Sequence, residues 1–171
     1  MKITLEHWDS EHKNELIKLC NSVNRQYLSD RIPFPYTEAD ADWWLDMISK
    51  EDGAGGLFRA IEVDGEYVGT VSAERKGDVY LNDAELGYML LDNYRGRGVM
   101  SEAVRLFCPL AFDALNLTRL TALVYEPNAA SCRVLEKNGF VRGGLMRKAV
   151  CKGGNIYDLV IFGKLKDEEN L

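Results

Sequence analysis

Two arginines and two glycines alternate in Arg95–Gly98, directly before residues with the apolar spacing of a helix. The first backbone N–H groups of a helix have no partners within it, and the aligned peptide dipoles favour negative charge at that end. Glycine allows the backbone to approach an anion closely, and the forked donors of arginine suit phosphate oxygens. The segment therefore predicts a phosphate-binding loop at a helix N-terminus.

The spacing of this loop excludes two common phosphate sites. No Gly-Lys-Ser/Thr triplet is present, so the loop is not that of an NTP-binding P-loop. The dinucleotide pattern G-x-G-x-x-G is also broken, because Ser101 stands where the third glycine would be. The loop also follows a predicted antiparallel meander late in the chain, which does not fit a dinucleotide-binding fold.

Other reactive residue types are sparse. Both histidines, His7 and His12, lie in the first dozen residues, and the four cysteines are scattered without a C-x-x-C pair. We therefore expect neither a zinc site nor a disulfide framework, and no metal of any kind. No pairing of a cysteine or serine with a histidine suggests a nucleophile with its base.

Length and charge narrow the class of protein. The 171 residues predict one domain over residues 1–166 and a frayed tail at 167–171. The formal net charge of −6 argues against a general binder of nucleic acid or of anionic membranes. The charged N-terminal segment has no apolar core, and no apolar run is long enough to span a bilayer, so we expect a cytoplasmic protein.

The apolar spacing predicts strands and helices that would position the loop. Alternating or apolar runs predict strands over residues 2–8, 57–63, 67–73, 81–91, 119–125, 140–150 and 156–165. Helical spacing and caps predict helices over residues 10–23, 37–50, 99–115 and 129–138, and Pro109 should kink or shorten the third. This order predicts a mixed α/β fold, with one sheet and helices on both of its faces.

Two segments together resemble a known superfamily. The run AELGYMLLDNYRGRGVMSEAV, followed by NAASCRVLEKNGF, is similar to the GCN5-related N-acetyltransferase (GNAT) superfamily, and most similar to the subgroup of ribosomal-protein N-terminal acetyltransferases. Arg95 and Gly98 match the first half of the superfamily's signature Gln/Arg-x-x-Gly-x-Gly/Ala, whereas Met100 departs at its third position. The run RIPFPYTEADADWWL also resembles the substrate-side segment of this subgroup.

The resemblance implies acetyl-CoA as co-substrate, bound in a V-shaped gap between the strands that end at Leu91 and Tyr125. Main-chain groups near Met89 and Leu90 would pair with the pantetheine arm, much as an added strand would. The other cofactor contacts implied by the resemblance come from Arg95, Gly96, Arg97, Gly98, Val99, Met100, Ser101 and Asn128.

The resemblance also implies direct attack of an amine on the thioester in a ternary complex, with no covalent enzyme intermediate. Glu85 matches the family's base, acting through water, although it could equally lie on a solvated strand face. Ser131 matches the acid of the subgroup, which replaces a tyrosine found in many relatives, or it could simply belong to a helix first turn. Tyr36 and Tyr157 are the candidate acceptor-binding residues.

The sequence leaves the acceptor open. A protein N-terminal α-amine is the first hypothesis, and a small amine, such as an antibiotic or a polyamine, is the second. A non-catalytic sensor that binds acyl-CoA is the alternative from another class. The expected partners are acetyl-CoA and the acceptor, with no nucleic acid or membrane, in a monomer or homodimer.

Overall fold

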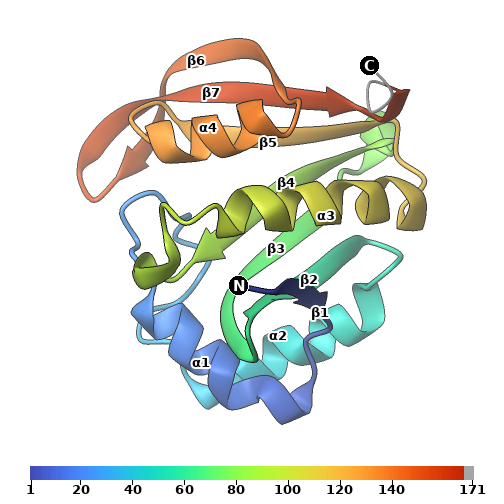
Figure 1. Ribbon diagram of the computed structural model, residues 1–171. Coiled ribbons are helices and arrows are strands. Elements are labelled where there is room, and N and C mark those ends of the chain that lie inside the picture. The colour runs from blue at the N-terminus through green and yellow to red at the C-terminus, as the bar shows by residue number, and fades with distance from the viewer. Residues whose placement is uncertain (168–171) are drawn as a thin grey trace.

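One mixed sheet organises the computed structural model, which describes residues 1–167. Within those residues the sheet has seven strands in the order β1-β2-β3-β4-β5-β7-β6 (Figure 1). Only β4 and β5 pair in parallel. The strands are β1 (Ile3–Glu6), β2 (Gly56–Val63), β3 (Glu66–Arg75), β4 (Asp83–Leu90), β5 (Arg119–Tyr125), β6 (Val141–Lys152) and β7 (Asn155–Leu165). The prediction of a mixed α/β sheet is confirmed.

Helices pack on both faces of this sheet, as predicted. They are α1 (Lys13–Ser22), α2 (Glu38–Glu51), α3 (Val99–Ala114) and α4 (Ala129–Lys137). One buried cluster contains side chains of α3 and α4, and a second contains those of α1 and α2. Successive residues of a strand point to opposite faces, so Leu57 and Ile61 of β2 enter the first cluster while Phe58 and Ala60 enter the second. Burial on both faces thus fixes the register of the central strands.

Local signals set the ends of the first two helices. The Thr37 side chain accepts a bond from the backbone N–H of Asp40, and the Asp40 carboxylate accepts one from the N–H of Thr37 at 2.8 Å. This is the capping box that the sequence predicts. Asp9 caps a short 3-10 turn before α1, so the regular helix begins at Lys13, slightly later than predicted.

Pro109 was predicted to kink or shorten its helix, and it does not shorten the helix, because α3 continues past it to Ala114. Pro109 lies on the exposed side of α3, while Phe107, Cys108 and Ala111 are buried. A proline deprives the carbonyl four residues earlier of its partner, and on the exposed side that carbonyl can bond to water. Packing of the buried side carries the helix through the proline.

The irregular segment 24–36 is tied to both halves of the sheet. Asn21 of α1 exchanges two hydrogen bonds with the backbone of Tyr36, at 2.8 and 2.9 Å. Arg31 pairs with Glu74 of β3 at 3.2 Å, and Asp30 pairs with Lys152 of β6. These contacts hold the segment over the face of β3 and β4 that α3 does not cover.

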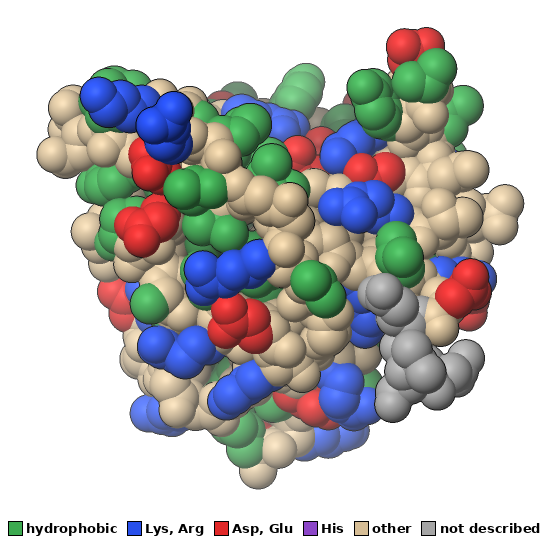
Figure 2. Space-filling view, turned by 90° about the horizontal axis from the view of Figure 1, so that it is seen from above, with side chains coloured by type: hydrophobic (Ala, Val, Ile, Leu, Met, Phe, Trp, Pro, Cys, Tyr) green, Lys and Arg blue, Asp and Glu red, His purple; other side chains and the backbone are tan. Residues whose placement is uncertain are grey.

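The far end of the sheet is formed by the β6–β7 hairpin, which exposes several large hydrophobic side chains. Seen from above, this side of the molecule shows acidic and basic side chains interspersed with hydrophobic ones (Figure 2). The predicted tail at 167–171 lies outside the described residues from position 168 onward.

Candidate active site

The sheet opens between its two parallel strands. β4 and β5 pair only from Asp83 to Glu85 against Arg119 to Thr121. β3 nevertheless follows β4 to Leu90, and β7 follows β5 to Tyr125, so the two halves of the sheet diverge beyond this short ladder (Figure 1). The facing edges of β4 and β5 therefore keep backbone groups available to an extended ligand.

Met89 and Leu90 lie where the resemblance places the pantetheine arm. Their side chains are buried in opposite clusters, Met89 with α1 and α2, and Leu90 with α3. Only the main chain of these residues can therefore face the gap, which fits a strand-like contact with a ligand amide. Their role in cofactor binding stays a prediction.

The arginine–glycine loop precedes α3 as expected. Gly96 and Gly98 have φ angles of 72° and 81°, which favour glycine, and Gly98 is the N-cap residue of α3. No side chain caps the N–H groups of the first turn of α3 within the described residues, so these donors remain available to an anion. Met100, which departs from the family signature, is buried in the core and so points away from the open side of the loop.

The guanidinium groups of the loop lie at the surface. Arg95 Nε pairs with Asp92 at 3.0 Å, and the Arg97 guanidinium lies 5.7 Å from the centre of the Tyr94 ring. Both arginines therefore remain accessible beside the first turn of α3. Their placement fits phosphate binding, which stays a prediction for Arg95, Arg97 and the five other residues of the loop.

Ser131 takes part in a hydrogen bond that the sequence analysis did not foresee. Asn128 caps α4, because its side chain accepts a bond from Ser131 N at 3.3 Å. The Ser131 hydroxyl lies 2.7 Å from the hydroxyl of Tyr88, which reaches it from β4. Burial raises the pKa of the Tyr88 phenol, so this group stays protonated and can donate to Ser131.

Tyr88 could have been found from the strand pattern alone. It alternates with Leu86 and Leu90, and these positions face α3 and α4 rather than α1 and α2. A polar hydroxyl on an inward-facing position needs a partner there. What the pattern could not supply is the identity of that partner.

Glu85 lies on the opposite face of β4 and is exposed. It stands opposite Glu74 of β3 and Thr121 of β5, at the last residue pair before the strands diverge. Glu85, on β4, and Ser131, on α4, thus lie on opposite faces of the sheet. With Glu85 as the base on one face and Ser131 as the acid on the other, an amine could attack a thioester held in the gap. Both catalytic roles stay predictions.

The two predicted acceptor residues have different surroundings. Tyr36 is only 7% exposed, and its hydroxyl donates to the carbonyl of Asp40 at 3.4 Å. Tyr157 of β7 is partly exposed and lies in a tyrosine cluster with Tyr27 and Tyr125, with ring centres 6.1 to 6.2 Å apart. Tyr27 comes from segment 24–36, which also carries Tyr36.

Neither a membrane span nor a metal centre is found among residues 1–167. No helix there has both the length and the apolar character required to cross a bilayer. No three His, Cys, Asp or Glu side chains of that range gather as metal ligands would.

Comparison with known proteins now identifies the family. Residues 2–141 match the model of the acetyltransferase (GNAT) domain, so the chain belongs to that family. It is an acetyl-CoA-dependent N-acetyltransferase, which confirms the prediction of the superfamily and of the enzyme class.

Individual relatives agree with this assignment. The chain is 43% identical over 95 residues to "Probable N-acetyltransferase YjcK" of Bacillus subtilis, a match that spans 56% of this chain and only 51% of that protein. It is 28% identical to "Putative ribosomal N-acetyltransferase YdaF" of Bacillus subtilis, over 96% of this chain and 90% of that protein. The structure of a ribosomal-protein-S5-alanine acetyltransferase from Vibrio fischeri shares the fold, with a TM-score of 0.83 and 23% identity, over 98% and 95% of the two chains.

Proposed function

We propose that this enzyme acetylates the N-terminal α-amine of a protein or peptide by direct attack in a ternary complex. The observation that carries the proposal is the exposed position of Glu85, at the last residue pair before β4 and β5 diverge. An exposed carboxylate is a weak base, so it suits an acceptor amine that is already partly neutral. The likeness to YdaF, whose name refers to the ribosome, supports the same class of acceptor.

The arithmetic of amine protonation favours an α-amine. An α-amino group has a pKa of about 7.8, so about one molecule in seven is neutral at pH 7. A lysine amine, with a pKa of about 10.4, is neutral in only about four molecules per ten thousand. The deficit of roughly 350-fold corresponds to about 3.5 kcal/mol, more than an exposed carboxylate acting through water supplies alone.

The chain's own groups would divide the remaining work between the two faces of the sheet. Acetyl-CoA supplies an activated acetyl group as a thioester. On one face, Glu85 accepts the proton of the attacking amine through water. On the other, Ser131 would donate a hydrogen bond to the leaving sulfur. Tyr88, whose hydroxyl lies 2.7 Å from Ser131 Oγ, would act as the donor to that oxygen and leave the serine proton for the sulfur.

Two matched peptides test the acceptor class. One has a free N-terminus and a blocked lysine side chain, and the other has a blocked N-terminus and a free lysine. Release of free CoA should be faster with the free N-terminus. Faster acetylation of the lysine peptide would overturn the N-terminal proposal, and the absence of CoA release with any amine would favour an acyl-CoA sensor.

The roles of Glu85 and Ser131 are tested by their pH dependence. Glu85→Gln should lower turnover more at low pH than at high pH, because an amine that is already neutral needs no base. Ser131→Ala should lower turnover across the whole range, since the leaving sulfur needs a donor in every cycle. A wild-type pH–rate profile for Glu85→Gln would show that Glu85 is only a surface carboxylate.

A polyamine is the second candidate acceptor, and one observation favours it. Glu74 and Glu85 stand directly opposite each other on neighbouring strands, so two carboxylates share the acceptor face. Arg31 pairs with Glu74 at 3.2 Å and offsets one of these charges. Spermidine belongs in the same assay, and turnover of spermidine above that of every peptide would select this candidate.

A further inference from the structure

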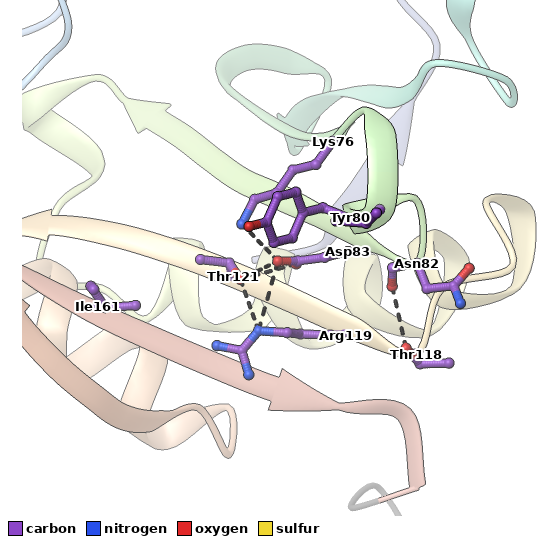
Figure 3. A pocket seen from close by; sticks show the side chains of 9 residues that line it. Lys76, Tyr80, Asn82, Asp83, Thr118, Arg119, Thr121 and Ile161 are labelled. Atoms are coloured by element: carbon purple, nitrogen blue, oxygen red, sulfur yellow. Dashed lines mark hydrogen bonds and ion pairs between the residues drawn. The ribbon is translucent and has the colours of Figure 1, made fainter.

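An open cavity of about 450 Å³ lies where β4 and β5 begin (Figure 3). Asp83 and Thr121 line the cavity. Asp83 lies two residues before Glu85 on β4, and Thr121 lies directly opposite Glu85 on β5, so all three side chains point to the same side of the sheet. The cavity therefore continues the acceptor face away from the gap between β4 and β5. Its volume falls in the range of small-molecule sites.

The charged side chains of this cavity carry a net positive charge. The Asp83 carboxylate accepts bonds from Lys76 Nζ at 2.6 Å and from Thr121 Oγ1 at 2.8 Å, and it lies 3.7 Å from Arg119 Nε (Figure 3). Two cations thus surround one carboxylate. In a protein of net charge −6, this local excess of positive charge would attract an anion.

The Arg119 side chain is held with its terminal nitrogens turned away from this network. Its Nε donates to Thr121 Oγ1 at 3.0 Å, whereas neither terminal nitrogen makes a hydrogen bond or ion pair within residues 1–167. Gly163 of β7 makes room for the guanidinium, because a Cβ at that position would lie only 2.6 Å from Arg119 Cζ. A fixed guanidinium with both terminal nitrogens free offers one N–H edge that suits the paired oxygens of a carboxylate or phosphate.

We propose that this cavity binds an anionic group of the acceptor, a carboxylate or a phosphate, while the acceptor amine lies beside Glu85. The inference rests on the proposed function and deepens it, because it describes the acceptor beyond its amine. The rim adds an apolar wall, since Val79 and Tyr80 are 81% and 63% exposed. Such a wall would cover the uncharged part of the acceptor between its two ends.

The spacing of the strands predicts where the anionic group lies in a peptide. Arg119 is one strand across from Glu85 and two residues back along β5, so the two Cα atoms are about 8 Å apart. In an extended peptide, the first and third residues point to the same side and lie about 7 Å apart. Because the Arg119 guanidinium lies over Gly163 of β7, one strand farther across, an acidic side chain at the third residue is a suitable first probe of this distance.

Peptides that differ only at the third residue test this proposal on the unmodified enzyme. Glutamate, glutamine and phosphoserine at that position compare a carboxylate, a neutral isostere and a phosphate. We expect kcat/KM to be about tenfold higher for glutamate than for glutamine, and the ratio to fall as salt is added. The faster of the glutamate and phosphoserine peptides identifies the anion, and equal rates for all three would overturn the proposal.

Variants then locate the preference. Arg119→Gln should reduce the glutamate-to-glutamine ratio to about one, and Lys76→Gln should reduce it in part. Lys50→Gln on α2, which removes the same charge from a residue that does not line the cavity, should keep the full ratio. Retention of the ratio in a folded Arg119→Gln variant, with folding checked by CoA binding, would overturn the assignment.

The two proposals can fail separately. If peptides are acetylated at equal rates, the anionic subsite is wrong and the N-terminal function stands. If no peptide reacts but small amines do, the N-terminal function is wrong, and the subsite is tested with 6-aminohexanoate against hexylamine. Equal rates for that pair would overturn the subsite as well.

Discussion

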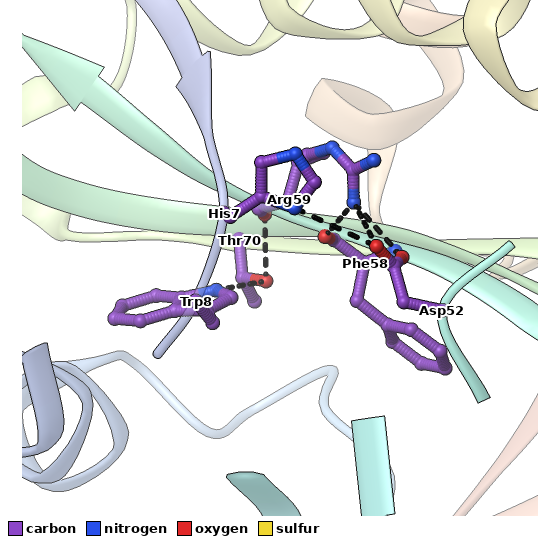
Figure 4. Close-up of polar contacts among 6 residues, drawn as sticks. All are labelled: His7, Trp8, Asp52, Phe58, Arg59 and Thr70. Atoms are coloured by element: carbon purple, nitrogen blue, oxygen red, sulfur yellow. Dashed lines mark hydrogen bonds and ion pairs between the residues drawn. The ribbon is translucent and has the colours of Figure 1, made fainter. Parts of the chain in front are cut away.

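Two carboxylates, Asp52 at the end of α2 and Asp83 on β4, each lie beside an arginine, and the two arginines use their nitrogens differently. Arg59 Nη1 lies 2.9 Å from both oxygens of Asp52 and 2.6 Å from the carbonyl of Phe58 (Figure 4). Asp52 also accepts a bond from Phe58 N at 3.0 Å. Arg119 meets Asp83 only through Nε, and its terminal nitrogens stay outside the network.

The difference separates a structural contact from a binding surface. Asp52 is the C-cap residue of α2, so its pair with Arg59 fastens the end of that helix to β2. The Arg59 side chain is only 13% exposed, which leaves little of it for a ligand. Substitutions in this closed region, the Asp52–Arg59 pair, should therefore change the free energy of unfolding. Substitutions near the gap between β4 and β5, or in the Arg95–Ser101 loop, should instead change CoA binding or turnover.

The largest expected effect comes from Gly98→Asp, at the loop before α3. A carboxylate there would repel the pyrophosphate of CoA, and affinity should fall at least about 100-fold, measured by calorimetry. The free energy of unfolding should fall by only about 1 kcal/mol, because a non-glycine residue must adopt the left-handed φ of 81°. Gly65→Asp is the matched control, since Gly65 also has a positive φ, of 92°, but lies in the β2–β3 turn. Normal CoA affinity in Gly98→Asp would remove the loop from the binding site.

Arg59→Leu tests the closed region. Loss of the guanidinium leaves the partly buried Asp52 without its cation, and the free energy of unfolding should fall by about 2 kcal/mol in chemical denaturation. The kcat/KM of the folded enzyme should stay within about twofold of wild type. Adding Asp52→Asn should recover part of the stability. A large loss of activity without a loss of stability would erase the distinction between the two regions.

Tyr88→Phe removes one hydroxyl at the gap and keeps the ring. We expect kcat to fall about tenfold, equivalent to about 1.4 kcal/mol, while the KM for acetyl-CoA stays within about twofold. In a Ser131→Ala background the same change should have no further effect on kcat, because the tyrosine would act only through the serine. Equal losses in both backgrounds would mean that the Tyr88 hydroxyl acts independently of Ser131.

The smallest effect is expected from Asp40→Asn in the α2 cap. Hydrogen bonds from Thr37 hold the pKa of the Asp40 carboxyl below 3.8, so the ionised form stabilises the fold above that pH. This contribution is lost as the pH falls through the lowered pKa. The variant should melt about 1–2 °C below wild type at pH 7, and the difference should shrink below pH 3.8. A difference in melting temperature that stays the same between pH 7 and pH 3 would exclude a role for the Asp40 charge. The acetyltransferase activity of the variant should equal that of wild type.

Much of the fold could be predicted because its signals are local. The capping box at Thr37, the Asp64–Gly65 turn and the Arg95–Ser101 loop each lie within a few residues of one another. Pro109 misled because its effect on the helix depends on which side of α3 faces water. That side is set by packing, which no single residue type reveals.

The contacts of the site were harder to predict because they join distant parts of the chain. Tyr88 and Ser131 are 43 residues apart, and their contact requires both the face of β4 and the position of α4. Arg119 and Gly163 meet only because β7 pairs beside β5 in a particular register. Residue types along the chain indicate which groups could react, but the sheet decides which of them meet.

The short ladder between β4 and β5 would also make the resistance of this enzyme to proteolysis depend on a bound cofactor. Only three residue pairs join β4 and β5, so the edges beyond them are open to acetyl-CoA in the folded protein. The unfolded chain has no such edges, so acetyl-CoA would bind the folded state alone. A ligand that binds only the folded state stabilises it by about 2.7 kcal/mol at a concentration 100 times its Kd. When acetyl-CoA and free CoA are both scarce, more of this enzyme would therefore be open to proteases.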